Sequence, residues 1–307
     1  MIRPEYKAQV DLLLSLLPHV ATEQLLALKG GTAINLFVNN MPRLSVDIDL
    51  TYTRWQDERT VALQNISDAL ERIESQIKKA NPVVHVTRVP VGQGEDAKLN
   101  CQTPQATVKI EVNTVTRGLL FPNQLLSVTQ AVQTEFKKFA VINVVSHAEL
   151  YGSKICAALD RQHPRDLFDV QYLLNSGGIS WEVKMGFLLF LISHARPTHE
   201  LLKPNLQNQQ QTFERQFSGM TIEPFTYADY EATREQLITS VNRALTDAEK
   251  NFLISFIKGE PDWDLIPIPE IPNFPAVQWK LKNIVSLRNS NSVKHENLCV
   301  ALEEILM

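Results

Sequence analysis

Two aspartates spaced two residues apart are the first feature of the sequence that could carry out chemistry. Asp47 and Asp49 lie in "SVDIDLTYT" (45–53), where apolar and polar residues alternate as in a strand with one buried face. Residues i and i+2 of a strand project from the same face, so the two carboxylates would lie side by side. Like charges so close repel each other unless a cation lies between them, and Mg²⁺ suits such a pair because it binds carboxylates together with substrate phosphates. Taken alone, the pair is more typical of a strand end that faces water.

A glycine turn lies ahead of the aspartates. Gly30 and Gly31 interrupt an apolar run, and Thr32 opens the stretch 32–38, whose apolar residues recur at helical spacing. Backbone N–H groups and the dipole at the start of a helix can receive a phosphate, and Thr32 would add a hydroxyl donor. Two glycines before a helix are also often no more than a turn.

Further polar residues extend this set. Arg43 and Ser45 lie just ahead of the aspartates, where a cation and a hydroxyl could hold triphosphate oxygens. Glu111 lies on the polar face of the strand-like stretch 106–115 and could complete a cluster of three carboxylates, although a solvated strand residue has the same pattern. Three carboxylates, two metal ions and a phosphate-binding turn are the layout of nucleotidyl transfer: one metal activates the acceptor oxygen and the other stabilises the pyrophosphate leaving group.

A second charged cluster lies in "SHAELYGSKICAALDRQHPRDLFDVQYLL" (146–174). Lys154 and Arg161 are seven residues apart and share a helix face, while Asp166 and Asp169 begin the next predicted helix. One interpretation is a set of surface salt bridges, which contribute little to stability. The functional interpretation is a lysine that contacts phosphate, with Asp166 orienting it or acting as a base towards the acceptor.

The elements that must position these residues follow from periodicity. Helical spacing predicts helices at 5–17, 32–38, 57–79, 146–159 and 163–178, and a nearly all-helical pattern from 181 onward. Alternation predicts strands at 45–53, 83–89, 97–102, 106–115 and 139–146, with a strand or helix end at 24–30 and a hairpin-like turn at Gly92 and Gly94. The proline-rich segment 261–277 is expected to be extended on the surface. A composition shift near 176–180 predicts domains at 1–178 and 179–307.

The bulk composition excludes several classes of protein. A net charge of −4 over 307 residues disfavours a globally basic coat for nucleic acid, although a local basic groove remains open. The cysteines (Cys101, Cys156, Cys299) are too far apart for a disulfide framework or zinc site, which favours a reducing compartment. No apolar run is long enough to span a bilayer, and the N-terminus has no signal-peptide layout. We therefore expect a cytoplasmic protein without a membrane partner.

The two clusters together resemble the AbiEii/AbiGii family of nucleotidyltransferase toxins, members of the DNA polymerase β-like superfamily. The family pattern of a K-G-G-T/S turn and then R-x-S-x-D-I-D-L is matched by Lys29 to Thr32 and by Arg43 to Leu50. The later patterns K-x-x-A-L-x-x-R and P-R-D-x-x-D-L are matched by Lys154 to Arg161 and Pro164 to Val170, with Ala158 and the final valine in place of leucines.

A third stretch, 245–284, is similar to the closing segment of many members, in which "GEPDW" and "PAVQWKL" recur. The resemblance implies an α+β fold: a polymerase β-like mixed sheet with flanking helices, followed by a mostly α-helical C-terminal domain. It implies a toxin of a toxin–antitoxin or phage-defence system, with a cognate antitoxin as partner. Such a toxin uses Mg²⁺ (or Mn²⁺) to transfer a nucleoside monophosphate from an NTP to an acceptor, in relatives the tRNA 3′ end, which blocks translation.

The resemblance also assigns roles to residues. Asp47 and Asp49 would hold the metals, Lys154 would contact the nucleotide phosphates, and Asp166 would complete the catalytic site. Glu111 is the candidate third metal ligand. The nucleotide would be bound by Lys29, Gly30, Gly31, Thr32, Arg43, Ser45 and Arg161.

Two other functions remain open from the sequence. The acceptor could be a small molecule or a protein hydroxyl, because the motifs describe only the donor site. The chain could also be a non-catalytic nucleotide-binding partner module, although the intact charged residues argue against that. An RNA acceptor requires local positive charge, and the candidates are Lys29, Arg43, Lys137, Lys138, Lys154, Arg161 and Arg165.

Overall fold

The computed structural model describes residues 3–91 and 95–307, so the predicted turn at Gly92 and Gly94 lies outside the described residues. The chain divides into two compact units. The sheet unit comprises Met1–Ser146 and Phe217–Pro224, and the helical unit comprises His147–Gln216 and Phe225–Met307. This division places the boundary after Ser146, whereas the sequence predicted it near 178; the two helices that follow Ser146 pack against later helices.

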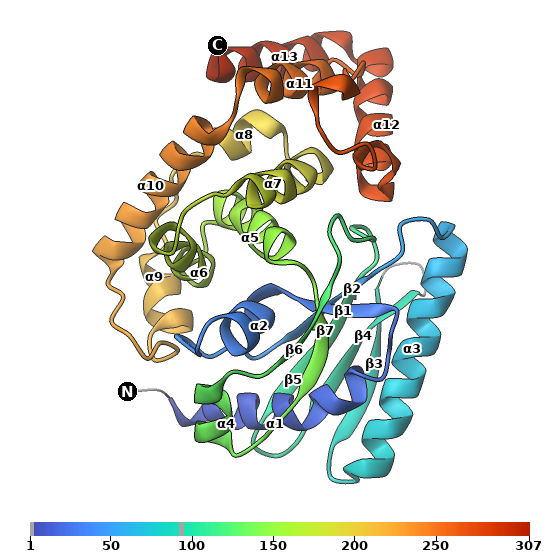
Figure 1. Ribbon diagram of the computed structural model, residues 1–307, viewed down its shortest axis with the longest axis vertical. Coiled ribbons are helices and arrows are strands. Elements are labelled where there is room, and N and C mark those ends of the chain that lie inside the picture. Colours follow the sequence, from blue (N-terminus) through green and yellow to red (C-terminus); the bar gives the residue numbers. More distant parts are fainter. Residues whose placement is uncertain (1–2, 92–94) are drawn as a thin grey trace. The chain divides into compact units, whose positions relative to one another are not determined.

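The sheet unit is a mixed sheet flanked by helices (Figure 1). Its helical elements are α1 (Pro4–Val20), α2 (Gly30–Ala33), the π-helical turn η1 (Ile34–Val38), α3 (Arg59–Ala80) and α4 (Gln130–Phe136). Its strands are β1 (Leu26–Lys29), β2 (Ile48–Tyr52), β3 (His85–Val91), β4 (Glu95–Gln102), β5 (Thr107–Asn113), β6 (Gln124–Ser127) and β7 (Val141–Val144). Within the described residues these strands form one seven-stranded sheet in the order β3-β4-β5-β2-β1-β7-β6. The predicted α+β class with a mixed sheet is confirmed.

The central strand β2 lies between β1, which is antiparallel to it, and β5, which is parallel. Ile48 and Leu50 pair in register with Ile110 and Val112, and all four side chains are almost fully buried on the face that α1 and α3 cover (Figure 1). Because side chains alternate along a strand, the aspartates lie on the opposite face. The predicted alternation is confirmed, although the strand itself begins at Ile48, one residue after Asp47.

Two elements of the sheet unit, β6 and α4, are absent from the sequence-based expectation. β6 is an edge strand that is largely exposed, so its sequence shows none of the alternation that marks a half-buried strand. The predicted helix at 32–38 does form, but its first turn starts at Gly30 and its second turn is π-helical.

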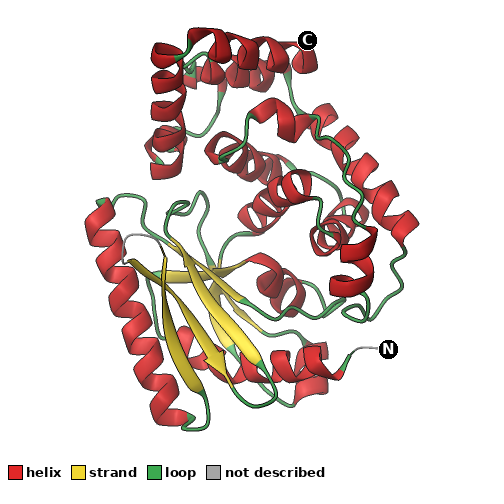
Figure 2. Ribbon diagram, turned by 180° about the vertical axis from the view of Figure 1, so that it is seen from behind, coloured by secondary structure: helices red, strands yellow, loops and turns green. Residues whose placement is uncertain are grey.

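The helical unit contains α5 (His147–Arg161), α6 (Pro164–Asn175), α7 (Trp181–Ser193), α8 (Thr198–Leu202), α9 (Gln210–Thr212), α10 (Tyr227–Ala244), α11 (Asp247–Ile257), α12 (Pro275–Ser290) and α13 (Ser292–Leu306). Figure 2 shows this part of the chain as helices and loops. α5 crosses α7 with backbone against backbone, because Gly152 and Gly186 face the partner helix and a Cβ on either glycine would collide with it. This close crossing fixes the helix that carries Lys154.

The segment 261–277 is not extended as expected. It contains the short 3₁₀ turns η3 (Trp263–Leu265) and η4 (Ile271–Asn273), and α12 already begins at Pro275. Ile266, Ile268 and Ile271 are buried, so these apolar residues turn inward and the prolines separate the turns. In the part of the chain that the structure describes, no helix is long and apolar enough to cross a membrane.

Candidate active site

The carboxylate of Asp49 lies directly against the glycine turn. Asp49 Oδ2 is 2.6 Å from the position that a Cβ on Gly30 would occupy. Gly30 also has a φ of +71°, a left-handed conformation that glycine adopts without a steric penalty. Both constraints make glycine necessary here, and the result is a carboxylate adjoining the backbone of a helix start.

Arg43 and Ser45 approach the second glycine in the same way. Arg43 Nη2 lies 2.7 Å and Ser45 Oγ lies 3.0 Å from the position of a Cβ on Gly31. The segment that carries them is fixed by backbone pairing with residues 220–222, where Leu44 N donates to Met220 O at 2.8 Å. Arg43, Ser45 and Asp49 therefore gather at the turn formed by Gly30 and Gly31.

Thr32 and Arg43 are more deeply buried than the sequence analysis expected. Thr32 is fully buried, and its hydroxyl lies 3.0 Å from Ser45 Oγ and donates to the backbone carbonyl of Asp47. The hydroxyl thus fixes the strand that carries the aspartates and is not presented to a phosphate. Arg43 is only 2% exposed and donates to the carbonyl of Leu44 at 2.9 Å, so it places positive charge beneath the turn instead of at its surface.

A row of four charges crosses the polar face of the sheet at Asp49. Lys29 on β1 pairs in register with Asp49 on β2. Asp49 pairs in turn with Glu111 on β5, and Glu111 pairs with Lys98 on β4. Register partners project from the same face, so cations and anions lie in the order + − − +. Lys98 Nζ forms an ion pair with Glu111 Oε2 at 3.0 Å.

The expected cluster of three carboxylates does not form. Among the described residues, no group of three Asp, Glu, His or Cys side chains is arranged to hold a metal. Glu111 is half exposed and is engaged by Lys98, which corrects its assignment as the third ligand. Asp47 and Asp49, both half-buried on one face, still fit Mg²⁺, which needs only one or two carboxylates when substrate phosphates and waters complete its coordination.

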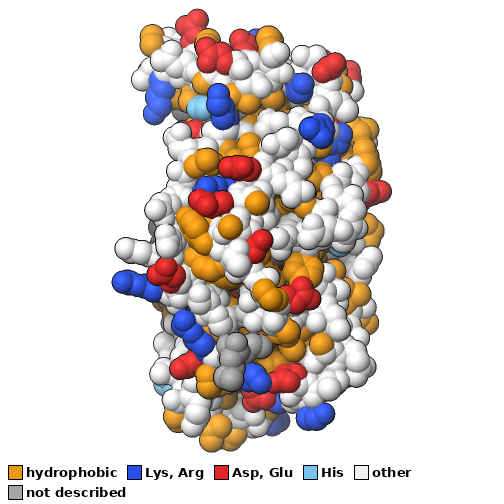
Figure 3. Space-filling model, turned by 90° about the vertical axis from the view of Figure 1, so that its left-hand side faces the viewer, with side chains coloured by type: hydrophobic (Ala, Val, Ile, Leu, Met, Phe, Trp, Pro, Cys, Tyr) orange, Lys and Arg blue, Asp and Glu red, His pale blue; other side chains and the backbone are white. Residues whose placement is uncertain are grey.

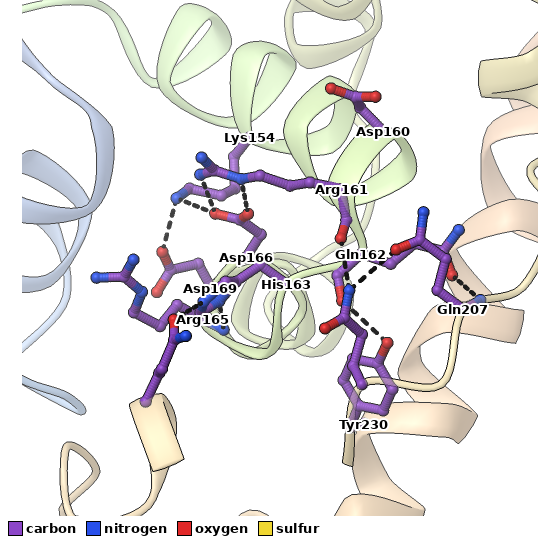
Figure 4. A network of polar contacts seen from close by, with 12 residues as sticks. Lys154, Asp160, Arg161, Gln162, His163, Arg165, Asp166, Asp169, Gln207 and Tyr230 are labelled. Atoms are coloured by element: carbon purple, nitrogen blue, oxygen red, sulfur yellow. Dashed lines mark hydrogen bonds and ion pairs between the residues drawn. The ribbon is translucent and has the colours of Figure 1, made fainter. Parts of the chain in front are cut away.

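The second cluster lies within the helical unit and is described by itself. Lys154 on α5 is held between two carboxylates of α6: its Nζ lies 3.0 Å from Asp166 Oδ1 and 3.1 Å from Asp169 Oδ2 (Figure 4). Arg161 donates to the same Asp166 through Nε at 2.5 Å and Nη2 at 3.0 Å. Lys154, Asp166 and Asp169 are buried, while Arg161 is 59% exposed. The arrangement is a buried network, and the surface salt bridges considered above are excluded for these residues.

The charges of this network decide what Asp166 can do. Burial raises the pKa of Asp166, but Lys154 and Arg161 outweigh that effect and hold the pKa well below its usual range. A carboxylate that stays ionised and fully hydrogen-bonded is a weak proton acceptor. Of the two roles left open by the sequence, orientation of Lys154 and Arg161 is the one that fits.

The turn between α5 and α6 is clamped from two sides. Gln162 has a φ of 48°, and its backbone carbonyl accepts from Tyr230 Oη at 2.9 Å. Its side-chain oxygen accepts from Gln207 N at 3.0 Å and from Arg234 Nη1 at 3.3 Å (Figure 4). At the start of α6, His163 Nδ1 accepts from Arg165 N at 3.1 Å and caps the helix. These contacts fix the angle at which Arg161 meets Asp166.

Asp169 is the residue of this network that sequence reasoning did not assign to the site. The signal was present, because Asp166 and Asp169 are three residues apart and so share a face of α6. The packing of α5 on α6 places Lys154 between the two carboxylates.

Three of the seven basic residues expected to bind RNA are engaged in ion pairs with carboxylates. Lys138 pairs with Asp11 at 2.7 Å, and Lys154 and Arg161 pair with carboxylates as described. On the face drawn in Figure 3, Lys and Arg side chains are interspersed with Asp and Glu side chains. Positive charge is therefore local on that face and does not form a broad patch.

The contact of Asp49 with a glycine turn, on a mixed sheet in a chain that also carries a helical unit, is the arrangement expected of a nucleotidyltransferase. The family model for the nucleotidyl transferase AbiEii toxin of type IV toxin–antitoxin systems matches residues 11–283. The chain belongs to this family, and it is a nucleotidyltransferase toxin.

The fold has a solved counterpart. The structure is similar to that of MenT4, a nucleotidyltransferase toxin from Mycobacterium tuberculosis H37Rv, with a TM-score of 0.62 over 93% of this chain and 94% of that chain. The two sequences are 16% identical, so the likeness concerns the fold alone. Among curated proteins, no sequence matches the chain.

Proposed function

We propose that this toxin transfers a nucleoside monophosphate from an NTP to the 3′ end of an RNA, with tRNA as the acceptor, and so blocks translation. The proposal rests on one observation: the side chain of Asp49 lies against Gly30, and the side chain of Ser45 lies against the neighbouring Gly31. A phosphate received by the backbone of that turn would lie beside Asp49, so Asp47 and Asp49 would hold a divalent cation close to it.

Asp47 and Asp49 are the proposed ligands of Mg²⁺ or Mn²⁺. When bound, the metal supplies Lewis-acid charge that activates the acceptor hydroxyl and neutralises the departing pyrophosphate. The chain itself contributes position: Thr32 fixes the backbone of Asp47, the glycine turn seats the triphosphate, and the buried Arg43 adds positive charge beneath it. The terminal 3′ oxygen forms a bond to the α-phosphorus as the bond from that phosphorus to pyrophosphate breaks.

Lys154 and Arg161 are proposed to contact the nucleotide phosphates, as the family pattern implies. The contacts in this chain support that role. Two buried carboxylates hold Lys154 in one position, and the side chain of Arg161 stays largely exposed. Asp166 and Asp169 act as positioning residues for them. Both proposed substrates, an NTP and tRNA, occur in the cytoplasm, where a cognate antitoxin would counter the toxin and where defence against phage would operate.

The decisive experiment uses NTPs labelled at the α-phosphate, because only that phosphate stays with the transferred nucleotide. Purified protein is incubated with each of the four NTPs, Mg²⁺ and total RNA, and the labelled species are separated by size. We expect label on small RNA, and we expect periodate oxidation of the RNA 3′ terminus to prevent labelling. Asp49→Asn should abolish the signal. Asp247→Asn, which changes a side chain that is 99% exposed, should retain it.

Other outcomes separate the competing functions. Label found only on protein or on a small molecule would exclude an RNA acceptor while leaving nucleotidyl transfer intact. NTP binding with no labelled product from any acceptor would favour a non-catalytic nucleotide-binding module.

A further inference from the structure

Arg117 carries a guanidinium that the fold buries without an acceptor. The residue is 5% exposed, and its Nε and Nη1 donate to no atom of the described residues. Burial of a charged group costs free energy unless hydrogen bonds or an ion pair offset the cost, and arginine does not escape by losing its proton. A buried donor without an acceptor needs an explanation, and one explanation is a ligand that supplies the acceptor when it binds.

The loop that carries Arg117 is fixed on both sides. Thr51 Oγ1 donates to the carbonyl of Thr116 at 3.0 Å, and Gly118 N donates to the carbonyl of Tyr52 at 2.7 Å. The hydroxyl of Thr116 is also buried, and it has no hydrogen-bond partner within the described parts of the chain. Two neighbouring polar groups therefore lack partners in a segment that is held against the end of β2.

The loop adjoins the segment that leads into α3, because Trp55 Cβ lies 2.5 Å from the position that a Cβ on Gly118 would occupy. Burial lowers the pKa of Arg117, and the charge of Arg59, the first residue of α3, lowers it further. The first turn of α3 contains no acidic residue and, over the described residues, no side chain caps it. The charges of Asp57, which accepts from the hydroxyl of Tyr52, and of the exposed Glu58 raise the pKa of Arg117 in part. Two guanidiniums beside the uncapped start of a 22-residue helix suit an anion such as phosphate.

The position of this loop along β2 distinguishes between possible phosphates. The glycine turn lies by Asp49 towards the start of β2, whereas the loop that carries Arg117 is bonded to Thr51 and Tyr52 at its end. Tyr52 is about 10 Å beyond Asp49 at the usual rise of a strand. The Arg117 loop is therefore separated along β2 from the glycine turn that is proposed to seat the triphosphate, and an acceptor chain whose 3′ end is at Asp49 has further phosphates to occupy it.

We propose that Arg117, Thr116 and the N-terminal turn of α3 bind a backbone phosphate of the RNA acceptor. This subsite rests on the RNA acceptor proposed above and adds the residues that hold it. It needs no basic patch on the surface, because a single desolvated guanidinium binds phosphate more strongly than an exposed one.

The test replaces Arg117 by methionine, which is similar in length and carries no charge. Because Arg117 leaves donors unpaired in the free protein, Arg117→Met should keep or raise the melting temperature. Its affinity for tRNA, measured by filter binding, should fall roughly tenfold, as expected for one lost charge-assisted hydrogen bond. The slope of log affinity against log salt should become shallower by about 0.7, the value for one phosphate contact on a single strand. NTP affinity, measured by equilibrium dialysis, should stay unchanged.

Two further variants complete the experiment. Arg117→Lys, which retains the charge without the planar fork, should recover part of the tRNA affinity. Lys79→Gln removes one positive charge from an exposed position near the other end of α3 and should leave both affinities within twofold.

Several results would overturn the subsite. A lower melting temperature of Arg117→Met with unchanged tRNA affinity would mean that Arg117 is structural. Reduced NTP affinity would mean that the subsite takes a nucleotide phosphate. If the wild-type protein labels RNA and Arg117→Met labels it equally well at high salt, the subsite alone is wrong. If the wild-type protein neither binds nor labels RNA, the proposed acceptor is wrong as well.

Discussion

The carboxylate of Asp49 occupies the space that any side chain on Gly30 would need, with Oδ2 only 2.6 Å from the position of a Cβ there. This single relationship joins the two sequence features that first indicated chemistry. It also means that any side chain added at Gly30 would displace the carboxylate of Asp49.

Gly30→Ala tests that relationship. The new Cβ would displace Asp49 and would also force alanine to a φ of +71°, so we expect transfer to fall by at least about 100-fold. Gly178→Ala is the matched control, because Gly178 has a φ of +76° and no atom of the described residues within 4 Å of its Cβ position. Strain alone should cost each variant about 1 kcal/mol in the free energy of unfolding. Normal transfer by Gly30→Ala would show that the position of Asp49 is not critical.

Asp47→Asn and Asp49→Asn test the proposed metal ligands. Removing one of two like charges relieves repulsion in the free protein, so the melting temperature should be unchanged or higher. Transfer should be lost, because an amide is a poor ligand for Mg²⁺. Thermal melts with and without Mg²⁺ and NTP provide a second readout, since ligand that binds the folded state raises the melting temperature. Near wild-type transfer by either variant at saturating Mg²⁺ would refute the assignment.

Lys154→Ala tests the buried network. The substitution leaves Asp166 and Asp169 buried without the cation between them, so the free energy of unfolding should fall by about 3 kcal/mol in urea titrations. Transfer should fall steeply even at temperatures where the variant is folded. Lys78→Ala, which breaks the ion pair of the exposed Lys78 with Glu74 on α3, should cost less than about 0.5 kcal/mol and leave transfer intact. A folded Lys154→Ala variant with full activity would limit Lys154 to a structural role.

His163 predicts a pH dependence of stability. Burial, and then the charge of Arg165, lower the pKa of His163 from 6.5 to about 4. Between these values the unfolded chain binds more protons than the folded one, so stability is complete above about pH 6.5 and falls as the pH drops towards 4. Protonation also removes the Nδ1 acceptor that caps α6.

His163→Asn isolates this effect, because asparagine also caps a helix and does not titrate. Between pH 7 and pH 4 the wild-type protein should lose about 1–2 kcal/mol more than the variant, after allowance for the partly exposed ring. Burial also lowers the pKa of His147 and His194, but both residues are present in both proteins and cancel in the comparison. Parallel pH profiles for the two proteins would contradict the prediction.

Local pattern in the sequence determined the elements around the site. Alternation over 45–53 placed Ile48 and Leu50 in the core and both aspartates on the other face, as the sheet confirms. Pro164 and the glycine pair after Asn175 correctly marked the ends of α6. The motifs around Asp47 and Lys154 indicated the family that the family model confirms. These patterns can be detected in a single sequence because each depends on residues only a few positions apart.

Tertiary structure alone decided which groups those residues meet. Strand register set Lys98 beside Glu111 and so removed that carboxylate from the expected metal cluster. Packing turned the hydroxyl of Thr32 inward, placed Asp169 against Lys154, and buried Arg117 without an acceptor. The residue type determines a side chain's charge and hydrogen-bonding capacity. Its partner is supplied by a segment that can lie tens of residues away, and its exposure depends on everything that packs around it.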